Sequence, residues 1–516
     1  MTSDVSAADR LGRRRMGGLL GAQPPLATSM STAAMSTKTT AQLELHDIQG
    51  GAVRGYTFAH SSFTFVEFQS AEGGRQWIAG MAGHVCSAAP WTGKPSSVVN
   101  VAFTAPGLRA LGLPDALLGT FPLPFLQGMA ARAGQIGDRG ASAPEHWEPP
   151  FGSARLHAVV WIHAADVKHL AQRQAEVFAE AESNQVTIVG RQDGAVRPDR
   201  REHFGFTDGL SQPEIEGLDS QPRHGHGAVM AGGGTRPIQP GEFLLGYPTE
   251  EGVLPDAPRP SALARNATFL VYRKIYQDVA AFRRLLSEQA RRLGWDEELV
   301  AAKLVGRWRD GTALALSPKA PGSGSGSGSA LGSARAPGSG SGSGSGPGSA
   351  KLVRQRGSTA SPSNDFSYAD DPQGLRCPVG AHIRRANPRD SLPFEGKLVN
   401  RHRMIRRGMP YGPLLRPGTN DDGVDRGLIF ASFQADLERQ FEFIQSQWLN
   451  DGNALGLGAA KDALVGNQDG TGTMIVPGAR TAFVHPLSSL VTIRAGEYFF
   501  VPGLGGLRWL ANPQLP

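Results

Sequence analysis

The chain has 516 residues and a formal net charge of +6, and 67 of its residues are glycine, about twice the usual ~7%. This length allows two to four domains, and the absence of any run of about 18 apolar residues excludes a membrane-spanning helix. Two cysteines, Cys86 and Cys377, are too few for a disulfide framework or a four-thiolate metal site.

The surplus positive charge lies in two low-complexity segments. Residues 1–41 hold five basic and two acidic residues, and residues 319–356 hold five basic residues and no acidic one. The rest of the chain therefore carries a net charge of −2. Proteins that bind nucleic acid concentrate positive charge on a folded face, so this distribution argues against a nucleic-acid partner.

Residues 1–41 are rich in Ser, Thr, Ala and Met without hydrophobic periodicity, which predicts a disordered leader. The arginines at 13–15 and the short apolar stretch after them resemble a twin-arginine signal, but Pro24 and Pro25 end that stretch early. We therefore expect a cytoplasmic protein, with export by a twin-arginine route as the less favoured alternative.

Beyond the leader, strand and helix patterns occur in two successive sets. The first set has strands predicted at 62–69 and 156–163 and a helix at 165–182. The second set has strands predicted at 267–274, 427–433 and 497–501 and helices at 278–294 and 436–448. Two mixed sets predict an α+β protein with two tandem halves, each a split βαβ unit. The pattern does not give the strand order.

Residues 320–350 are almost entirely Gly, Ser, Pro and Ala. Such a segment cannot bury enough apolar surface to offset the entropy of ordering, so we predict a flexible insertion without a binding role. The expected domains are an N-terminal half at 42–215 and a C-terminal half at 216–516, which this insertion interrupts.

The first of three unusual segments is GFTDG at 205–209, where Asp208 stands among glycines and an aromatic residue. A carboxyl group beside apolar rings has a raised pKa and can shuttle protons. Taken alone, an ordinary Asp-Gly turn is the favoured interpretation of this segment.

The other two segments are CPVGAHIRR at 377–385 and IRRGMPYG at 405–412. In the first, His382 follows small residues that allow a flat ligand to approach, and Arg384 and Arg389 are available for anionic groups. In the second, Arg406 enters a glycine–proline turn. Each of these segments alone is better explained by ordinary surface or core roles.

In this order, and followed by GLIFASF at 427–433, the three segments resemble the dye-decolorizing peroxidase family. The resemblance extends from about residue 47 to residue 502. It implies two tandem ferredoxin-like halves, with haem b (iron protoporphyrin IX) bound in the C-terminal half. It also implies that hydrogen peroxide is used to oxidise dyes and other bulky aromatic or phenolic reductants.

The same resemblance implies roles for individual residues. His382 would be the proximal iron ligand, Asp208 the distal acid–base residue and Arg406 its distal partner. Asp462 would hydrogen-bond the proximal histidine, with Asp469 as the rival. The remaining expected cofactor contacts are Phe430 at the pocket wall and Arg384 and Arg389 at the haem propionates.

Peroxide must lose a proton at one oxygen and regain it at the other. Asp208 can carry this proton, while Arg406 stabilises the negative charge that develops on the departing oxygen. Gly408 stands where some family members have asparagine, which removes one side chain from this network. Two alternatives remain: a non-catalytic haem or iron-handling protein on the same fold, and a haem-free interaction protein. The oligomeric state and the physiological reductant do not follow from the sequence.

Overall fold

The computed structural model describes residues 42–513, except 219–220, 222, 231–233, 320–362 and 395. The predicted leader and the glycine-rich insertion lie outside the described residues. None of the helices within the described ranges is long and apolar enough to cross a membrane.

The N-terminal half is built on a four-stranded antiparallel sheet. Its strands are β1 (His60–Phe68), β2 (Ser97–Phe103), β3 (Ala158–Ala164) and β4 (Val186–Ala195), in the order β4-β1-β3-β2. Helix α2 (Ala71–Met81) connects β1 to β2, and α6 (Val167–Phe178) connects β3 to β4. This is the strand order of a ferredoxin-like split βαβ unit.

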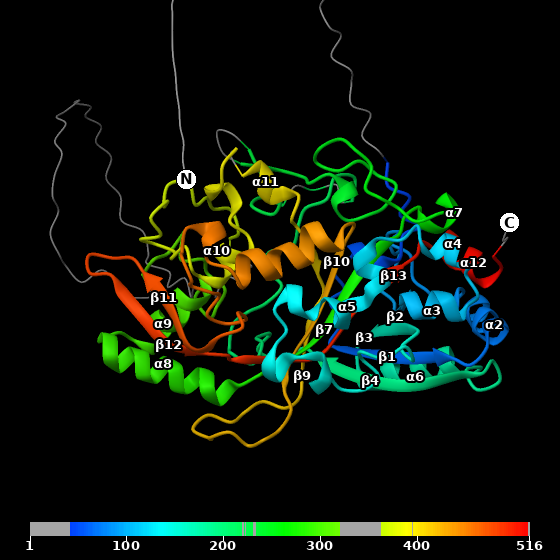
Figure 1. The fold of residues 1–516 in the computed structure, drawn as a ribbon, viewed down its shortest axis with the longest axis horizontal. Coiled ribbons are helices and arrows are strands. Elements are labelled where there is room, and N and C mark those ends of the chain that lie inside the picture. Colours follow the sequence, from blue (N-terminus) through cyan, green and yellow to red (C-terminus); the bar gives the residue numbers. More distant parts are fainter. Residues whose placement is uncertain are drawn as a thin grey trace, which may run out of the picture. The chain divides into compact units, whose positions relative to one another are not determined.

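The C-terminal half repeats the same order. Its strands are β7 (Thr268–Gln277), β8 (Ile405–Arg406), β10 (Gly427–Gln434) and β13 (Val491–Val501), in the order β13-β7-β10-β8. Helices α8 (Val279–Leu293) and α9 (Glu297–Val305) follow β7. The fourth strand again lies beside the first, so the prediction of two ferredoxin-like halves is confirmed. Strand β13 also pairs with β2, which joins both halves into one sheet (Figure 1).

Shorter elements fill the connections. The helices are α1 (Gly50–Val53), α3 (Ala105–Ala110), α4 (Asp115–Leu118), α5 (Leu123–Ile136), α7 (Ser261–Ala264), α10 (His382–Ala386), α11 (Lys397–Asn400) and α12 (Leu504–Ala511). The strands are β5 (Ala228–Val229), β6 (Thr235–Arg236), β9 (Met409–Tyr411), β11 (Asp469–Val476) and β12 (Ala482–Ser488). Strands β5 and β6 form one hairpin, and β11 and β12 form another.

The predicted helix at 278–294 shows how its sequence signals act. The Asp278 side chain accepts a hydrogen bond from the backbone N–H of Ala281 at 2.7 Å, and Gly294 ends the helix at a φ of +67°. The predicted helix at 436–448 forms as two wider π-helical turns, Leu437–Glu442 and Ile444–Leu449. Asn450 accordingly donates to the carbonyl of Gln445, five residues back.

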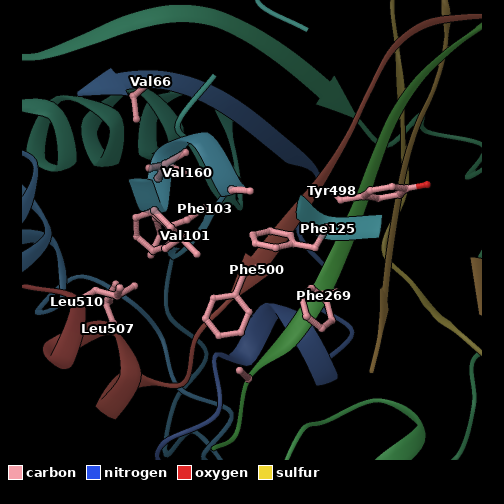
Figure 2. Packing of buried hydrophobic residues seen from close by; sticks show 14 of the residues in the cluster. Val66, Val101, Phe103, Phe125, Val160, Phe269, Tyr498, Phe500, Leu507 and Leu510 are labelled. Atoms are coloured by element: carbon pink, nitrogen blue, oxygen red, sulfur yellow. The ribbon is translucent and has the colours of Figure 1, made fainter. Parts of the chain in front are cut away.

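One hydrophobic core joins the two halves on one side of the sheet. Figure 2 shows Phe125 of α5, Phe269 of β7 and Phe500 of β13 packed together, with ring centroids 5.6 to 6.4 Å apart. Phe103 of β2 belongs to the same cluster. Burying several phenylalanines across this junction contributes roughly 1.5–3 kcal/mol for each ring, which favours a single cooperative body.

A second core lies between the two half-sheets. Phe63 of β1 contacts Tyr272 of β7 at 5.4 Å between ring centroids, and Trp161 of β3 contacts Phe433 of β10 at 5.9 Å. Because successive side chains of a strand point to opposite faces, the alternate residues of β7 and β10 face away from this core. That outer face of the C-terminal half carries the main cavity.

Candidate functional site

A cavity of about 610 Å³ lies on the outer face of the C-terminal half-sheet. Its walls come from the segment 202–211, from β7 and β10, from α10 and from the π-helical segment 437–449. The volume lies within the ~300–1,000 Å³ range typical of cofactor and ligand sites. Six residues singled out in the sequence line it together: His382, Asp208, Arg406, Arg389, Phe430 and Asp469.

His382, the first residue of α10, is hydrogen-bonded through its ring to a buried carboxylate. Its Nδ1 lies 3.1 Å from Oδ2 of Asp462, whose Oδ1 accepts the backbone N–H groups of Leu464 and Val465, each at 2.9 Å. Burial lowers the pKa of His382, but the charge and hydrogen bond of Asp462 outweigh burial and raise it. The pair orients the ring with Nε2 available to the cavity.

Asp469, the alternative partner of His382, makes a different contact. It is exposed at the start of β11, and its Oδ1 accepts hydrogen bonds from the N–H and hydroxyl groups of Thr471 at 3.0 and 2.6 Å. Asp462 is therefore the carboxylate that the structure places against the imidazole.

Arg406 is hydrogen-bonded to the residues that follow the GFTDG segment. The backbone N–H of Arg406 donates to Oε1 of Gln212 at 3.0 Å, and its Nη2 donates to the carbonyl of Ser211 at 2.9 Å. Asp208 lines the same cavity and is exposed to it, while its Oδ1 accepts the N–H of Gly209 at 2.6 Å. The chain bends at Gly209, whose φ is +77°, and presents the carboxylate of Asp208 to the cavity.

Glu202 supports this loop and was not found from the sequence. It is buried, and its carboxylate accepts the N–H groups of Phe206 and Phe204, each at 2.8 Å, and the amide of Gln277 at 2.7 Å. Burial raises the pKa of Glu202. An isolated glutamate that binds backbone N–H groups has no periodic signature, so no sequence pattern marks it.

Three arginines at the cavity wall, Arg389, Arg403 and Arg307, form no ion pair with a carboxylate among the described residues, whereas Arg273 is paired with Asp138. The guanidinium of Arg389 donates to the carbonyls of Phe366, Asn364 and Gly225 at 2.9, 3.0 and 3.2 Å. Burial, together with the charge of Arg307, lowers the pKa of Arg389 to about 10. Such a site favours an anionic ligand.

Arg403 and Arg307 extend this positive wall. Arg403 donates to the carbonyls of His226 and Gly227 at 3.0 and 3.3 Å. Burial lowers its pKa to about 9, and the charges of Arg389 and Arg406 add to that effect. Arg307 donates to the side-chain oxygen of Asn364 at 2.6 Å. Neither Arg403 nor Arg307 was expected at the site from the sequence.

Arg384, expected at the haem propionates, lies outside the cavity. Its side chain is 2% exposed, forms an ion pair with Asp371 at 3.3 Å and donates to the carbonyl of Cys377 at 2.7 Å. Two residues after His382 on a helix, its side chain points about 200° away around the axis. The expectation for Arg384 is therefore not met, because its charge is already paired with Asp371.

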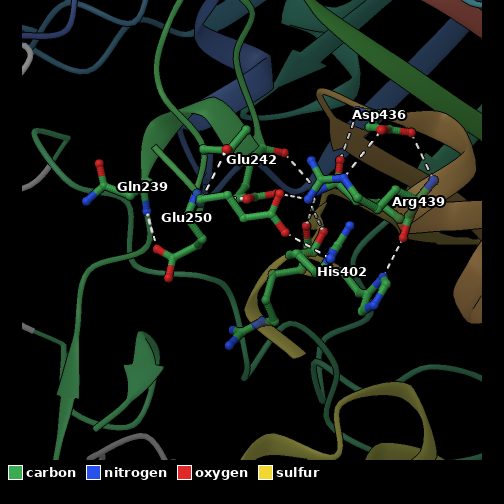
Figure 3. Close-up of polar contacts among 11 residues, drawn as sticks. Gln239, Glu242, Glu250, His402, Asp436 and Arg439 are labelled. Carbon is green, nitrogen blue, oxygen red and sulfur yellow. Dashed lines mark hydrogen bonds and ion pairs between the residues drawn. The ribbon is translucent and has the colours of Figure 1, made fainter. Parts of the chain in front are cut away.

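A polar network anchors the π-helical wall (Figure 3). Nη1 of Arg439 lies 2.7 Å from the buried carboxylate of Glu242, and Nε lies 3.3 Å from Asp436. Nδ1 of His402, which also lines the cavity, donates to the carbonyl of Arg439 at 2.5 Å. The network thus joins the start of the segment 437–449 to the chain that leads into β8. Further along, Phe441 lies 6.1 Å from the ring of Phe430.

Comparison with known proteins agrees with this architecture. Residues 47–198 match the family described as the DyP dimeric alpha+beta barrel domain, and residues 352–459 match Dyp-type peroxidase, C-terminal. The chain is 30% identical to a dye-decolorizing peroxidase of Mycena epipterygia, over 81% of this chain and 77% of that protein.

Solved structures of such peroxidases have the same fold. An ancestral D-type dye decolorizing peroxidase matches with a TM-score of 0.72 and 27% identity, over 91% of this chain and 99% of that one. A dye-decolorizing peroxidase in complex with 2,6-dimethoxyphenol matches with a TM-score of 0.70 and 25% identity, over 91% and 100% of the two chains. The chain therefore belongs to the dye-decolorizing peroxidase family, haem enzymes that use hydrogen peroxide as their oxidant.

Proposed function

We propose that the main cavity holds haem b, that His382 would bind its iron, and that this peroxidase oxidises dyes and bulky phenols there. The observation that carries the proposal is the His382–Asp462 pair, which opens onto a cavity shared with Asp208, Arg406 and unneutralised arginines.

The residues at the cavity fit such a cofactor. A neutral imidazole with a carboxylate on Nδ1 is the usual arrangement of a metal-ligating histidine. Arg389 and Arg403 offer guanidinium groups to two propionates, since among the described residues both donate only to backbone carbonyls. Neither Cys86 nor Cys377 lines the cavity, which favours haem b over a thioether-bound haem.

When bound, the haem iron supplies the redox chemistry that cleaves the peroxide O–O bond. Asp208 accepts the proton from one peroxide oxygen and returns it to the other, which leaves as water. Arg406 stabilises the negative charge that develops on the departing oxygen. Asp462 keeps His382 in one tautomer and raises its basicity.

The complex of a related peroxidase with 2,6-dimethoxyphenol supports a phenolic reductant for this chain. Two phenol molecules each lose one electron and one proton. One hydrogen peroxide takes up these two electrons and two protons and forms two waters. This stoichiometry needs no partner protein.

The test is oxidation of 2,6-dimethoxyphenol and of an anthraquinone dye by the haem-loaded protein. We expect oxidation that requires both haem and hydrogen peroxide, with two phenols consumed for each peroxide. Haem binding without any peroxide-dependent oxidation would overturn the proposal in favour of a non-catalytic haem or iron-handling protein.

A further inference from the structure

A second cavity, of about 540 Å³, lies next to the first and shares Phe204 with it. The flanking residues divide between the two cavities. Glu202 and Phe206 line only the main cavity, whereas His203 and Gly205 line only the second. The segment 202–206, which leads into Asp208, is therefore the partition between them.

The second cavity has an apolar floor. Val279 and Phe282 of α8 form it together with Phe204 and Leu415, and all four residues are buried, with 1–5% of their surface exposed. The rings of Phe204 and Phe282 lie 4.5 Å apart between centroids. Leu414, which also lines the cavity, is 49% exposed and offers accessible apolar surface against which an aromatic ring can pack.

The rim of this cavity is positively charged. Arginines 197, 201, 283 and 309 line it, whereas Asp199 and Glu297 are its acidic lining residues. Two of the arginines are neutralised, since Arg197 pairs with Asp199 at 2.7 Å and Arg309 with Glu298 at 2.8 Å.

The other two arginines keep their charge. Among the residues that the structure describes, Arg283 donates only to the carbonyls of Leu415 and Arg416, at 2.7 and 2.8 Å. No carboxylate pairs with the guanidinium of Arg201 within the part of the chain that the structure describes. Burial lowers the pKa of Arg283, and the neighbouring charge of Arg309 lowers it further. The rim thus carries two arginines without a carboxylate partner among the described residues, Arg201 and Arg283, and one unpaired carboxylate, Glu297, which leaves a net charge of +1.

We propose that the second cavity binds an aromatic anion, a sulfonated or carboxylated aromatic reductant. Its ring packs against Leu414, next to Leu415 in the apolar lining, and its anionic group contacts Arg201 and Arg283. That the bound molecule is oxidised rests on the proposed peroxidase function. Each docked phenolic anion then loses one electron across the partition and one proton to solvent. Two such molecules reduce one hydrogen peroxide to two waters.

Binding is measured first, in the resting haem-loaded protein without peroxide, by calorimetric titration with anthraquinone-2-sulfonate. Arg283→Glu is compared with Arg284→Glu, because Arg284 is exposed on the same helix and lines neither cavity. We expect Arg283→Glu to raise the Kd about tenfold or more, as for a lost charge-assisted hydrogen bond, and Arg284→Glu to leave it within about twofold. Equal Kd values in the two variants would overturn the site.

Because Arg283 also contacts the chain at 415–416, Arg201→Gln is a second variant that removes a rim charge without breaking a side-chain contact. A Kd raised in Arg201→Gln as well supports the anion site. A Kd unchanged in Arg201→Gln removes Arg201 from it.

Oxidation is measured second. The KM for a sulfonated phenolic dye should rise in Arg283→Glu relative to the KM for uncharged 2,6-dimethoxyphenol, whereas Arg284→Glu should leave both values unchanged. If the ratio of the KM for the sulfonated dye to the KM for 2,6-dimethoxyphenol is the same in Arg283→Glu as in the wild type, the second cavity is not a reductant site. If the wild type oxidises neither compound, the peroxidase proposal fails, and the binding comparison still decides what the cavity holds.

Discussion

The imidazole Nδ1 of His382 lies 3.1 Å from Oδ2 of Asp462, although the two residues are 80 positions apart in the chain. Two backbone N–H groups hold the other oxygen of this carboxylate, so neither the ring nor its partner is free to turn. The side chain of His382 is 30% exposed, whereas that of Asp462 is fully buried. The exposed part of the ring faces the cavity, and its orientation is set before any ligand binds.

The first prediction concerns this pair. Asp462→Asn keeps the acceptor for the two backbone N–H groups but removes the negative charge behind the ring. We expect haem to remain bound, activity to fall by about 10–100-fold, and the reduction potential of the iron to become more positive, because the imidazole is less basic. Spectroelectrochemical titration measures the potential. Asp469→Asn is the matched control, and an equal shift in both variants would contradict the assignment.

The second prediction separates the two distal roles. Asp208→Asn keeps the shape of the side chain but removes the base, so the reaction with peroxide should slow by about 100-fold or more while haem stays bound. Arg406→Leu should slow the same step by about 100-fold or more, because it removes charge stabilisation. Stopped-flow absorbance measures this step. A wild-type rate in Asp208→Asn together with a slow Arg406→Leu would assign the proton transfer to a group other than Asp208.

The third prediction concerns the glycine-rich insertion. The chain on both sides of it is anchored independently. Nε1 of Trp308 donates to the carbonyl of Ser317 at 2.8 Å, and Arg307 donates to Asn364 at 2.6 Å. Loop-closure cost changes slowly with length, so deleting most of residues 322–348 should change the unfolding free energy by no more than about 1 kcal/mol. Denaturation and haem content check this, and loss of haem in the shortened chain would contradict it.

The fourth prediction follows from a buried acid in β13. Glu497 is 8% exposed, and its Oε1 accepts the N–H groups of Met129 and Tyr498 at 3.0 and 2.8 Å. Burial raises its pKa from 4.5 to about 7. The folded protein therefore holds this proton more tightly than the unfolded chain does. Stability from this group is full below pH 4.5 and is lost as the pH rises to about 7.

Glu497→Gln keeps the acceptor but cannot ionise. It should therefore match the wild type near pH 4.5 and be more stable above pH 7, by up to about 3 kcal/mol. Urea denaturation across this pH range measures the difference. Glu67→Gln is the control of opposite sign, because the hydrogen bond from Arg155 lowers the pKa of Glu67. A constant difference between Glu497→Gln and the wild type at all pH values would contradict the account.

Sequence patterns predicted the strands and helices with strong local signals, such as the helix that begins after Asp278 and ends at Gly294. They missed β2, whose seven residues are all buried, and β4, which mixes polar and apolar residues without clear alternation. A short run that is buried throughout has no period that distinguishes strand from helix.

The site residues also divide into those that the sequence predicted and those that it did not. The resemblance in sequence brought together His382, Asp208 and Arg406, which share one cavity. It could not show that Arg384 turns away to Asp371, since this depends on the helical position of the side chain and on a distant partner. Glu202 and Arg403 form hydrogen bonds with backbone atoms. Every residue has these atoms, so no sequence pattern predicts such contacts. The division at residue 215 and a cytoplasmic location stay predictions.

The most direct test of the central claim is the absorption spectrum of the haem-loaded protein before and after one equivalent of hydrogen peroxide, recorded for the wild type and for His382→Ala. We predict a wild-type Soret band that changes on adding peroxide and returns when a phenol is added. In His382→Ala, haem should be lost or held weakly with an altered spectrum, because the protein ligand to iron is gone. A His382→Ala protein with wild-type haem content, spectrum and response to peroxide would contradict the account.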